Sequence, residues 1–296
     1  MKKPPVVPLV IPRSAAVANG TAPGQVGAKP RPSFPVQLPQ PVVLAQKPRA
    51  GGSPPPGAGR TQTAAPVARP LRTNTSPVAT GLGMDSQAVR ASMVRKLEAQ
   101  GISSPQVLAA MRAVERHRFV DSALANQGYE DTSLPIGLGQ TISKPSVVAR
   151  MTELLCQGRP EKLGRVLEIG TGCGYQAAVL SHLSREVYSI ERLRGLHERA
   201  RENLRWFRLA NVHLLFGDGM LGYAKGAPYA AIIAAAGGND IPQAWLDQLA
   251  VGGRLVAPAE TDAGRQNLVV IDKTSTGLVR TVLEAVLFVP LKSGVG

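Results

Sequence analysis

Short apolar runs alternate with stretches of helical spacing from about residue 85 onward. The runs have the length and β-branched content of buried strands, and they lie at 166–169, 187–190, 212–216, 231–235, 254–257, 268–271 and 282–289. Helical spacing of apolar residues follows the runs at 187–190, 231–235 and 254–257. This alternation predicts an α/β fold with a Rossmann-like, doubly wound sheet.

The last two runs predict a different connection. A short Thr-Ser-Thr-Gly turn at 274–277 lies between them, and the ten residues from 272 to 281 leave no room for a crossover helix. We therefore expect the sheet to end in an antiparallel C-terminal hairpin.

The region before the first run predicts a helical N-terminal cap on the sheet. One helix is expected at 87–100, and a second at 106–115, where Ser104 and Pro105 supply an N-cap and a first-turn proline. A long loop punctuated by glycine and proline follows at 129–145, and helical spacing returns at 147–157.

Composition divides the chain near residue 84. The first 84 residues contain 17 of the 25 prolines, ten of the 34 Lys and Arg residues, and none of the 20 Asp and Glu residues. They have no sustained period and few large apolar residues, so we expect a disordered, partly polyproline-like N-terminal tail. The catalytic domain is expected to span residues 85–296.

The net charge of +14 therefore belongs mostly to this tail. A basic tail favours weak, non-specific and salt-sensitive binding of anions, although a solvated extension without a partner is an open alternative. The tail lacks the amphipathic pattern of an organelle-targeting segment. The folded part is nearly balanced in charge, which argues against a nucleic-acid-binding domain.

Cysteine and histidine usage excludes several classes of protein. Two cysteines, Cys156 and Cys173, cannot form a disulfide framework, and the chain has no apolar run of membrane-spanning length. We expect a cytoplasmic protein. The four histidines show no metal-ligand spacing, so no metal site is predicted.

The segment 165–176 reads R-V-L-E-I-G-T-G-C-G-Y-Q, and in it the first predicted strand runs into a glycine loop. A dinucleotide fingerprint would need its third glycine where Tyr175 stands, so a pyrophosphate is the less favoured ligand. The pattern E-x-G-x-G-x-G after a strand resembles that of methyltransferases that use S-adenosylmethionine as cofactor. Its candidate cofactor-binding residues are Glu168, Gly170, Thr171, Gly172 and Gly174. An ordinary strand-to-helix turn is the alternative.

Ligands bind at the carboxyl ends of strands in such a sheet, which draws attention to two further acidic residues. Glu191 closes the run at 187–190 and lies 21 residues after Gly170. This is close to the spacing at which an acidic side chain binds ribose hydroxyls. Asp218, followed by Gly219, is the candidate for the adenine edge, although Gly-Asp-Gly also forms plain turns. Glu168 is expected to orient the loop and the amino group of the methionine moiety.

Several ordered motifs together make a more specific match. The loop 134–145 (L-P-I-G-L-G-Q-T-I-S-K-P) closely resembles a segment of the protein-L-isoaspartate O-methyltransferases, and the likeness extends over 85–291. It includes the segments 111–120, 166–174, 217–219, 252–255 and 288–291. The chain departs from the family pattern at Ala230 and at 236–240.

This resemblance implies the class I S-adenosylmethionine-dependent methyltransferase fold and a repair activity. The expected reaction transfers a methyl group to the free α-carboxyl of L-isoaspartyl, and also D-aspartyl, residues in damaged proteins and peptides. The resemblance places the substrate-side serine at Ser143, and we expect Thr141 to assist it. Because a carboxyl group is ionised at neutral pH, the reaction needs alignment rather than a strong general base.

Alternatives stay open at this stage. Ser143 could instead cap the helix that starts near Pro145. The chain could methylate a small molecule or RNA, or it could bind the cofactor without turnover and work through its basic tail.

Overall fold

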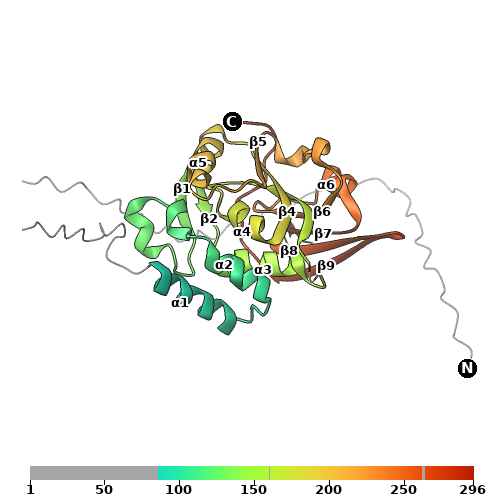
Figure 1. Ribbon diagram of the computed structural model, residues 1–296. Coiled ribbons are helices and arrows are strands. Elements are labelled where there is room, and N and C mark those ends of the chain that lie inside the picture. The colour runs from blue at the N-terminus through green and yellow to red at the C-terminus, as the bar shows by residue number, and fades with distance from the viewer. Residues whose placement is uncertain (1–85, 160, 262–263) are drawn as a thin grey trace, which may run out of the picture. The chain divides into compact units, whose positions relative to one another are not determined.

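The computed structural model describes residues 86–159, 161–261 and 264–296. The predicted tail, residues 1–84, lies outside this part of the chain. Within it, seven strands form one sheet in the order β5-β4-β3-β6-β7-β8-β9 (Figure 1). The strands are β3 (Leu163–Ile169), β4 (Ser184–Glu191), β5 (Val212–Phe216), β6 (Tyr229–Ala234), β7 (Leu249–Glu260), β8 (Gln266–Thr274) and β9 (Gly277–Ala285).

The first five strands in this set are parallel, and β8 and β9 are antiparallel to their neighbours. This confirms the predicted doubly wound sheet and its antiparallel C-terminal hairpin. The register places Ile169 opposite both Ile190 and Ala234. The carboxyl ends of β3, β4 and β6 therefore meet at one edge of the sheet, where such folds bind ligands.

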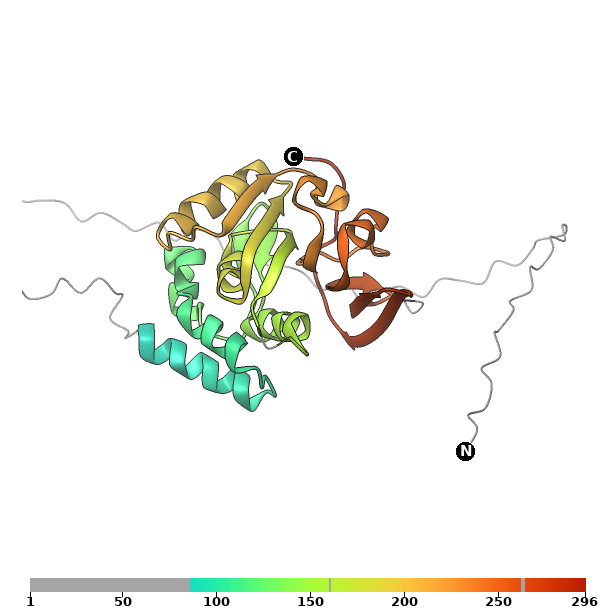
Figure 2. The ribbon, with the colours of Figure 1, turned by 45° about the vertical axis from the view of Figure 1, so that its right-hand side comes forward.

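Helices cover both faces of the sheet, which explains why its central strands read as continuous apolar runs. On one face, α3 (Pro145–Cys156), α4 (Tyr175–Leu183) and α5 (Arg194–Arg205) share a core with the sheet. On the other face, α6 (Gln243–Gln248) contributes the buried Trp245 to a second core. Figure 2 shows α5, in gold, beside the parallel strands.

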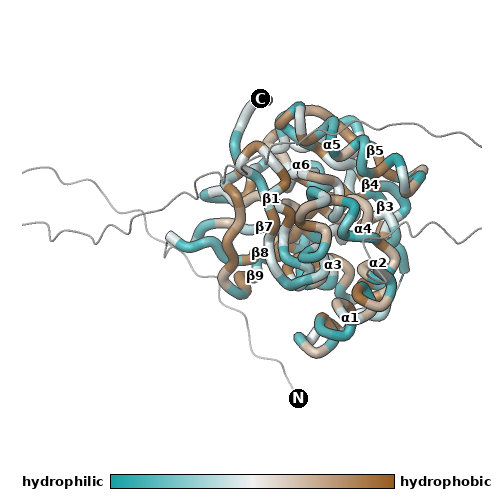
Figure 3. Tube along the Cα trace, turned by 90° about the vertical axis from the view of Figure 1, so that its left-hand side faces the viewer, coloured by the Kyte–Doolittle hydropathy of each residue, from teal (hydrophilic) through white to brown (hydrophobic). Residues whose placement is uncertain are grey.

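The helical N-terminal cap is confirmed. Helix α1 (Ser86–Ala99) and helix α2 (Pro105–Ala113) pack with α3 and α4, outside the sheet. The Ser104 hydroxyl accepts a hydrogen bond from Val107 N at 3.5 Å, and Pro105 occupies the first turn. Along α1 and α5, hydrophilic and hydrophobic positions alternate, as expected for helices with one face toward the core (Figure 3).

One predicted helix is wrong. Instead of a helix after 254–257, strand β7 continues to Glu260 and turns directly into β8. The two strands pair without a break, from Arg254 opposite Asp272 to Glu260 opposite Gln266. Backbone pairing over this length outweighs the weak helical spacing of the intervening residues.

The C-terminal run also differs from its prediction. Strand β9 ends at Ala285 rather than at residue 289. The chain then leaves the sheet edge, and Gly237 N donates to Val289 O at 2.9 Å while Leu291 N donates to Gly237 O at 2.7 Å. These bonds bring the segment after Phe288 back to the ligand-binding edge.

The loop expected at 129–145 contains a small hairpin. Strand β1 (Leu134–Gly137) pairs with β2 (Gln140–Ile142), and Leu138 at the turn has a positive φ of 51°. Arg199 of α5 donates to Ile136 O at 2.8 Å and fastens this hairpin beside the glycine loop. Four short 3₁₀ helices complete the described elements: η1 (Arg116–Phe119), η2 (Ser122–Gln127), η3 (Gly219–Leu221) and η4 (Ala224–Gly226).

Candidate active site

A pocket of about 470 Å³ lies at the carboxyl ends of β3, β4 and β6. Segments far apart in sequence form its wall, among them the glycine loop, the end of β4, the β1–β2 hairpin and the segment after β9. Among the predicted site residues, its lining includes Thr141, Ser143, Gly170, Thr171, Gly172, Glu191 and Gly219. The predicted cofactor loop and the predicted substrate serine therefore share one cavity. Glu168, Gly174 and Asp218 are not among the lining residues, but each is next in the chain to a residue that is.

The glycine loop has a backbone conformation that residues with a Cβ atom rarely adopt. Gly170, Gly172 and Gly174 have φ values of 87°, 56° and 92°. A Cβ atom on Gly174 would lie 3.1 Å from Leu204 Cδ1 of α5. The glycines thus allow both the tight turn into α4 and the close approach of α5.

Hydrogen bonds from two sides hold this loop. Gly170 N donates to Ile190 O at 2.9 Å, and Gly172 N donates to Glu191 Oε2 at 2.9 Å. Asn203 of α5 donates to Cys173 O at 2.9 Å. The loop is therefore fixed by β4 and α5 before any ligand binds.

Glu191 is a buried residue of the site. It is 5% exposed, and its second oxygen, Oε1, accepts from Leu193 N at 2.9 Å. None of the ion pairs among the described residues includes it, so it does not pair with Arg192 or Arg194. Each carboxylate oxygen retains accepting capacity, as a partner of two ribose hydroxyls would need.

Glu168 is fully buried at the end of β3. Ser189 donates to its Oε2 at 2.5 Å, and the Ser189 hydroxyl also bonds Thr171 Oγ1 at 2.7 Å, which connects Glu168 to the glycine loop. Burial raises the pKa of Glu168 to about 8, against the lowering effect of the Ser189 hydrogen bond and of the polar Gln176 side chain nearby. The sequence argument missed Ser189 because its role depends on the pairing of β3 with β4.

Two buried polar atoms in this region have no hydrogen-bond partner among the described residues. They are Glu168 Oε1 and Gln176 Nε2. Such atoms are costly unless a ligand satisfies them. One acceptor atom and one donor atom fit the amino and carboxylate groups of an amino acid, so these two residues fit the methionine end of S-adenosylmethionine.

Asp218 has both oxygens engaged. Oδ1 accepts from Met220 N at 2.8 Å and caps η3, while Oδ2 accepts from Gly294 N at 2.6 Å. Gly219 beside it has no space for a side chain, because a Cβ atom would lie 2.7 Å from Ile169 Cγ2. Trp245 of α6 donates to Gly219 O at 2.8 Å and fixes this turn.

The substrate side of the pocket carries Thr141, which is exposed, and Ser143, which is half-buried. Ser143 does not cap helix α3: the N-cap is Lys144, and Asp131 Oδ1 from the preceding loop accepts from Ser146 N at 2.9 Å. The capping alternative for Ser143 is therefore wrong, and its hydroxyl has no assigned partner among the described residues. The carbonyl of Ser143 accepts from Arg116 Nη2 at 2.7 Å.

The segment after β9 is the part of the site that strand and loop patterns do not predict. Residues Val289, Pro290, Leu291 and Lys292 line the pocket. Arg192 Nε donates to Gly294 O at 2.9 Å, which fastens the segment to the end of β4. The signal available in the sequence was the family-like motif at 288–291.

Cys173 lies in the glycine loop but is buried. Burial raises the pKa of Cys173 to about 11, so its thiol stays protonated although it lies in the glycine loop. Among the described residues no group of His, Cys, Asp and Glu side chains is placed to hold a metal ion. In the same part of the chain, no helix combines the length and apolarity needed to cross a membrane.

Comparisons with known proteins agree with this geometry. The family model for protein-L-isoaspartate(D-aspartate) O-methyltransferase matches residues 88–296. A protein-L-isoaspartate O-methyltransferase of Methylibium petroleiphilum is 56% identical over 281 residues, covering 90% of this chain and 98% of the relative. One of Ralstonia nicotianae is 52% identical over 283 residues and covers 88% of each chain.

Solved structures give the same fold. A protein-L-isoaspartate O-methyltransferase structure superposes with a TM-score of 0.64 at 30% identity, over 70% of this chain and 67% of that chain. The methyltransferase from Plasmodium falciparum, solved in complex with S-adenosyl-L-homocysteine, has a TM-score of 0.60 at 24% identity, over 69% and 98%. The matched family model spans more than half of the chain, and the chain belongs to the protein-L-isoaspartate(D-aspartate) O-methyltransferase family.

Proposed function

We propose that this protein transfers a methyl group from S-adenosylmethionine to the free α-carboxyl of L-isoaspartyl, and also D-aspartyl, residues in damaged proteins and peptides. The observation that carries this proposal is the shared cavity. One pocket is lined both by the glycine loop with Glu191 and by the Thr141 to Ser143 segment. Cofactor and acceptor can therefore meet without rearrangement of the sheet.

The cofactor half of the pocket assigns a role to each acidic residue. Glu168 and Gln176 are proposed to hold the amino and carboxylate groups of the methionine end, because both carry buried polar atoms without partners. Glu191 is proposed to accept from the ribose hydroxyls and Asp218 from the adenine amine. Bound S-adenosylmethionine supplies an electrophilic methyl group.

The acceptor half needs alignment more than proton transfer. An acceptor carboxylate is ionised at neutral pH and already carries the electron pair that forms the new C–O bond. The Ser143 hydroxyl, with Thr141, is proposed to hold this carboxylate by hydrogen bonds and to fix its direction of approach. Placement of this kind contributes roughly 7–11 kcal/mol to lowering a barrier.

Two smaller proposals concern the whole chain. Cys156 and Cys173 are both buried free thiols, which supports a reducing, cytoplasmic setting. For the basic segment 1–84, we retain the proposal of weak, salt-sensitive anion binding that is accessory to catalysis. Deletion of residues 1–84 would then leave methylation of a short isoaspartyl peptide unchanged.

The test of the activity uses two synthetic peptides that differ only in having isoaspartate or aspartate at one position. The full chain and labelled S-adenosylmethionine are incubated with each peptide. Methylation of the isoaspartyl peptide alone supports the proposal. Binding of the cofactor without methylation of either peptide would contradict it and would favour a different acceptor or a binding protein.

A further inference from the structure

Arg116 is a buried cation directly behind the substrate side of the pocket. It belongs to η1, its exposed fraction is 0%, and its guanidinium carbon lies 4.7 Å from the centroid of the Tyr175 ring. Its Nη2 donates to the carbonyl of Ser143 at 2.7 Å and more weakly to that of Thr132 at 3.5 Å. Ser143 and Tyr175 both line the pocket.

This guanidinium has no anionic partner among the described residues. None of the ion pairs found there includes Arg116, and its Nε and Nη1 atoms have no hydrogen-bond partner. Burial lowers the pKa of Arg116, but an arginine side chain in a protein stays charged. A buried charge without a counter-ion destabilises the fold. We therefore expect such a charge to have a function.

Asp131 does not neutralise this charge. It forms no ion pair with Arg116, and its Oδ1 accepts the backbone N–H of Ser146. The contacts found are those with the Ser143 and Thr132 carbonyls and with the face of Tyr175, and Cys173 of the glycine loop is close enough to act electrostatically. These neighbours lie on the substrate loop, in the glycine loop or at the start of α4.

We propose that Arg116 is a positioning residue, which fixes the backbone of Ser143 and supplies the positive potential that favours a carboxylate over a neutral group at the acceptor site. This inference rests on the proposed function, because an isoaspartyl acceptor is a carboxylate. A purely structural arginine would stabilise the loop equally for a charged and for a neutral ligand.

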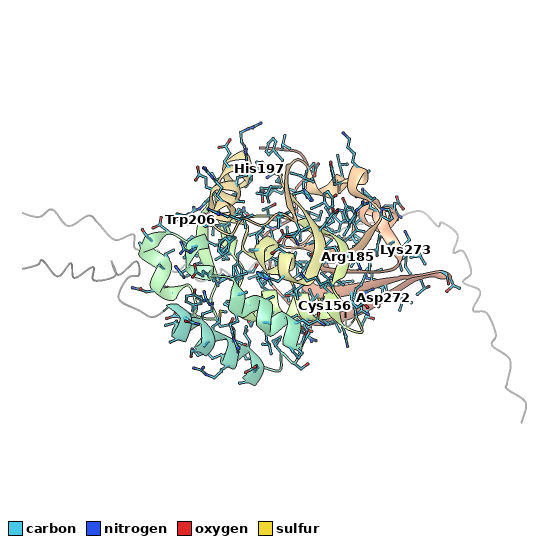
Figure 4. The ribbon with its side chains drawn as sticks, viewed as in Figure 1. Cys156, Arg185, His197, Trp206, Asp272 and Lys273 are labelled. Carbon is cyan, nitrogen blue, oxygen red and sulfur yellow. The ribbon has the colours of Figure 1, made fainter. Side chains whose placement is uncertain are left out.

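Arg118 provides a matched control within the same 3₁₀ helix. It pairs with Glu115 and lies 5.3 Å from the ring centroid of Trp206, which is 75% exposed (Figure 4). It is therefore a surface arginine that already has an anionic partner. Its replacement by Met should change neither the affinity for substrate nor the preference for charge.

The experiment compares the wild-type chain with the variants Arg116→Met, Arg116→Lys and Arg118→Met. Each is assayed with an isoaspartyl peptide as substrate and with the same peptide, its α-carboxyl converted to an amide, as competitive inhibitor. Calorimetry with S-adenosylhomocysteine measures the cofactor site separately. Circular dichroism and thermal melting check the fold of each variant.

The expected result is a loss of discrimination. Arg116→Met should raise KM for the isoaspartyl peptide about tenfold or more and bring it close to the inhibition constant of the amide, because a charged interaction is lost. The affinity for S-adenosylhomocysteine should change less than about twofold. Arg116→Lys keeps the charge and should retain the preference for the carboxylate, even if turnover falls through the loss of the planar contacts. If Arg116→Met does not fold, Arg116→Lys still decides the question of charge.

Other outcomes would overturn the inference. Parallel loss of peptide and cofactor affinity, with the carboxylate preference unchanged, would make Arg116 structural, and so would loss of this preference in Arg116→Lys. An effect of Arg118→Met as large as that of Arg116→Met would show that the site does not single out Arg116. Failure of the wild-type chain to methylate the isoaspartyl peptide would instead refute the proposed function, and this inference with it.

Discussion

The carboxylate of Asp218 accepts a hydrogen bond from the backbone N–H of Gly294, with Oδ2 and the nitrogen 2.6 Å apart. The two residues are 76 positions apart in sequence, and their bond ties the segment after β9 to the turn after β5. The other oxygen of Asp218 caps η3. The residue proposed for the adenine edge thus also anchors one wall of the cavity.

Replacing Asp218 by Asn tests this double role. Asparagine keeps one oxygen for the cap at Met220 N but replaces the other with an NH₂ group, which cannot accept from Gly294 or from an adenine amine. We expect the affinity for S-adenosylhomocysteine, measured by calorimetry, to fall about tenfold, because one charge-assisted acceptor is lost. Asp240→Asn is the control, since that side chain is 75% exposed and forms an ion pair with Arg280. Equal affinity in wild type and Asp218→Asn would exclude Asp218 from the adenine site.

Glu168 predicts a specific pH dependence of stability. Its pKa is about 8 in the folded protein, above the ordinary value of 4.5. Between these two values the folded chain keeps a proton that the unfolded chain has lost, so the free energy of unfolding falls as pH rises through this window. Glutamine does not titrate, so Glu168→Gln lacks this pH-dependent loss of stability. The variant should therefore gain stability relative to wild type from pH 5 to pH 8, by an amount on the order of a few kcal/mol.

Urea denaturation of both forms at several pH values, without cofactor, measures this difference. The difference between the two curves is the informative quantity, since it cancels the titration of the histidines. A difference that does not change with pH would mean that Glu168 is ionised when buried.

Ser143→Ala separates catalysis from binding of the cofactor. The serine hydroxyl has no capping role, because Lys144 is the N-cap of α3 and Asp131 bonds the first turn. Removal of the hydroxyl should lower kcat for an isoaspartyl peptide roughly tenfold to a hundredfold and leave the affinity for S-adenosylhomocysteine unchanged. Equal losses in kcat, cofactor affinity and melting temperature would instead assign Ser143 to the stability of the loop.

Gly174→Ala tests the need for glycine at the start of α4. Gly101 is a matched control, because its φ of 99° is close to the 92° of Gly174 and no heavy atom lies within 4 Å of its added Cβ. Gly101→Ala should cost about 1–2 kcal/mol of stability from backbone strain alone. Gly174→Ala should cost more, because the new methyl group crowds Leu204, and it should also weaken cofactor binding. Urea denaturation and calorimetry give the two quantities, and equal costs at both sites would contradict the close approach of α5.

The sequence predicts the parts of this protein that depend on local periodicity and on short motifs. The glycine loop, the place of Glu191 at the end of a strand and the ladder of strands follow from patterns within a few residues, whereas Ser143 came from the family resemblance. The end of β7 was missed because pairing with β8 overrides local spacing, and the β1–β2 hairpin was missed because its turn residues read as a plain loop.

The site residues that the sequence did not indicate share another property. Ser189 and Arg116 form hydrogen bonds to elements that are distant in sequence, and Gln176 lines a pocket that distant segments build. A buried arginine cannot be distinguished from a surface one by its neighbours in the chain, as Arg116 and Arg118 demonstrate. Only packing reveals which of them is buried behind the pocket.

The most direct test of the account is to identify the atom that receives the methyl group. The full chain is incubated with S-adenosylmethionine and an isoaspartyl peptide that also carries ordinary carboxyl groups, and the product is analysed by tandem mass spectrometry. We expect a methyl ester on the isoaspartyl α-carboxyl alone, followed by loss of methanol to the succinimide. Methylation of an ordinary aspartyl or glutamyl carboxyl, or no ester at all while the cofactor binds, would contradict the proposed function.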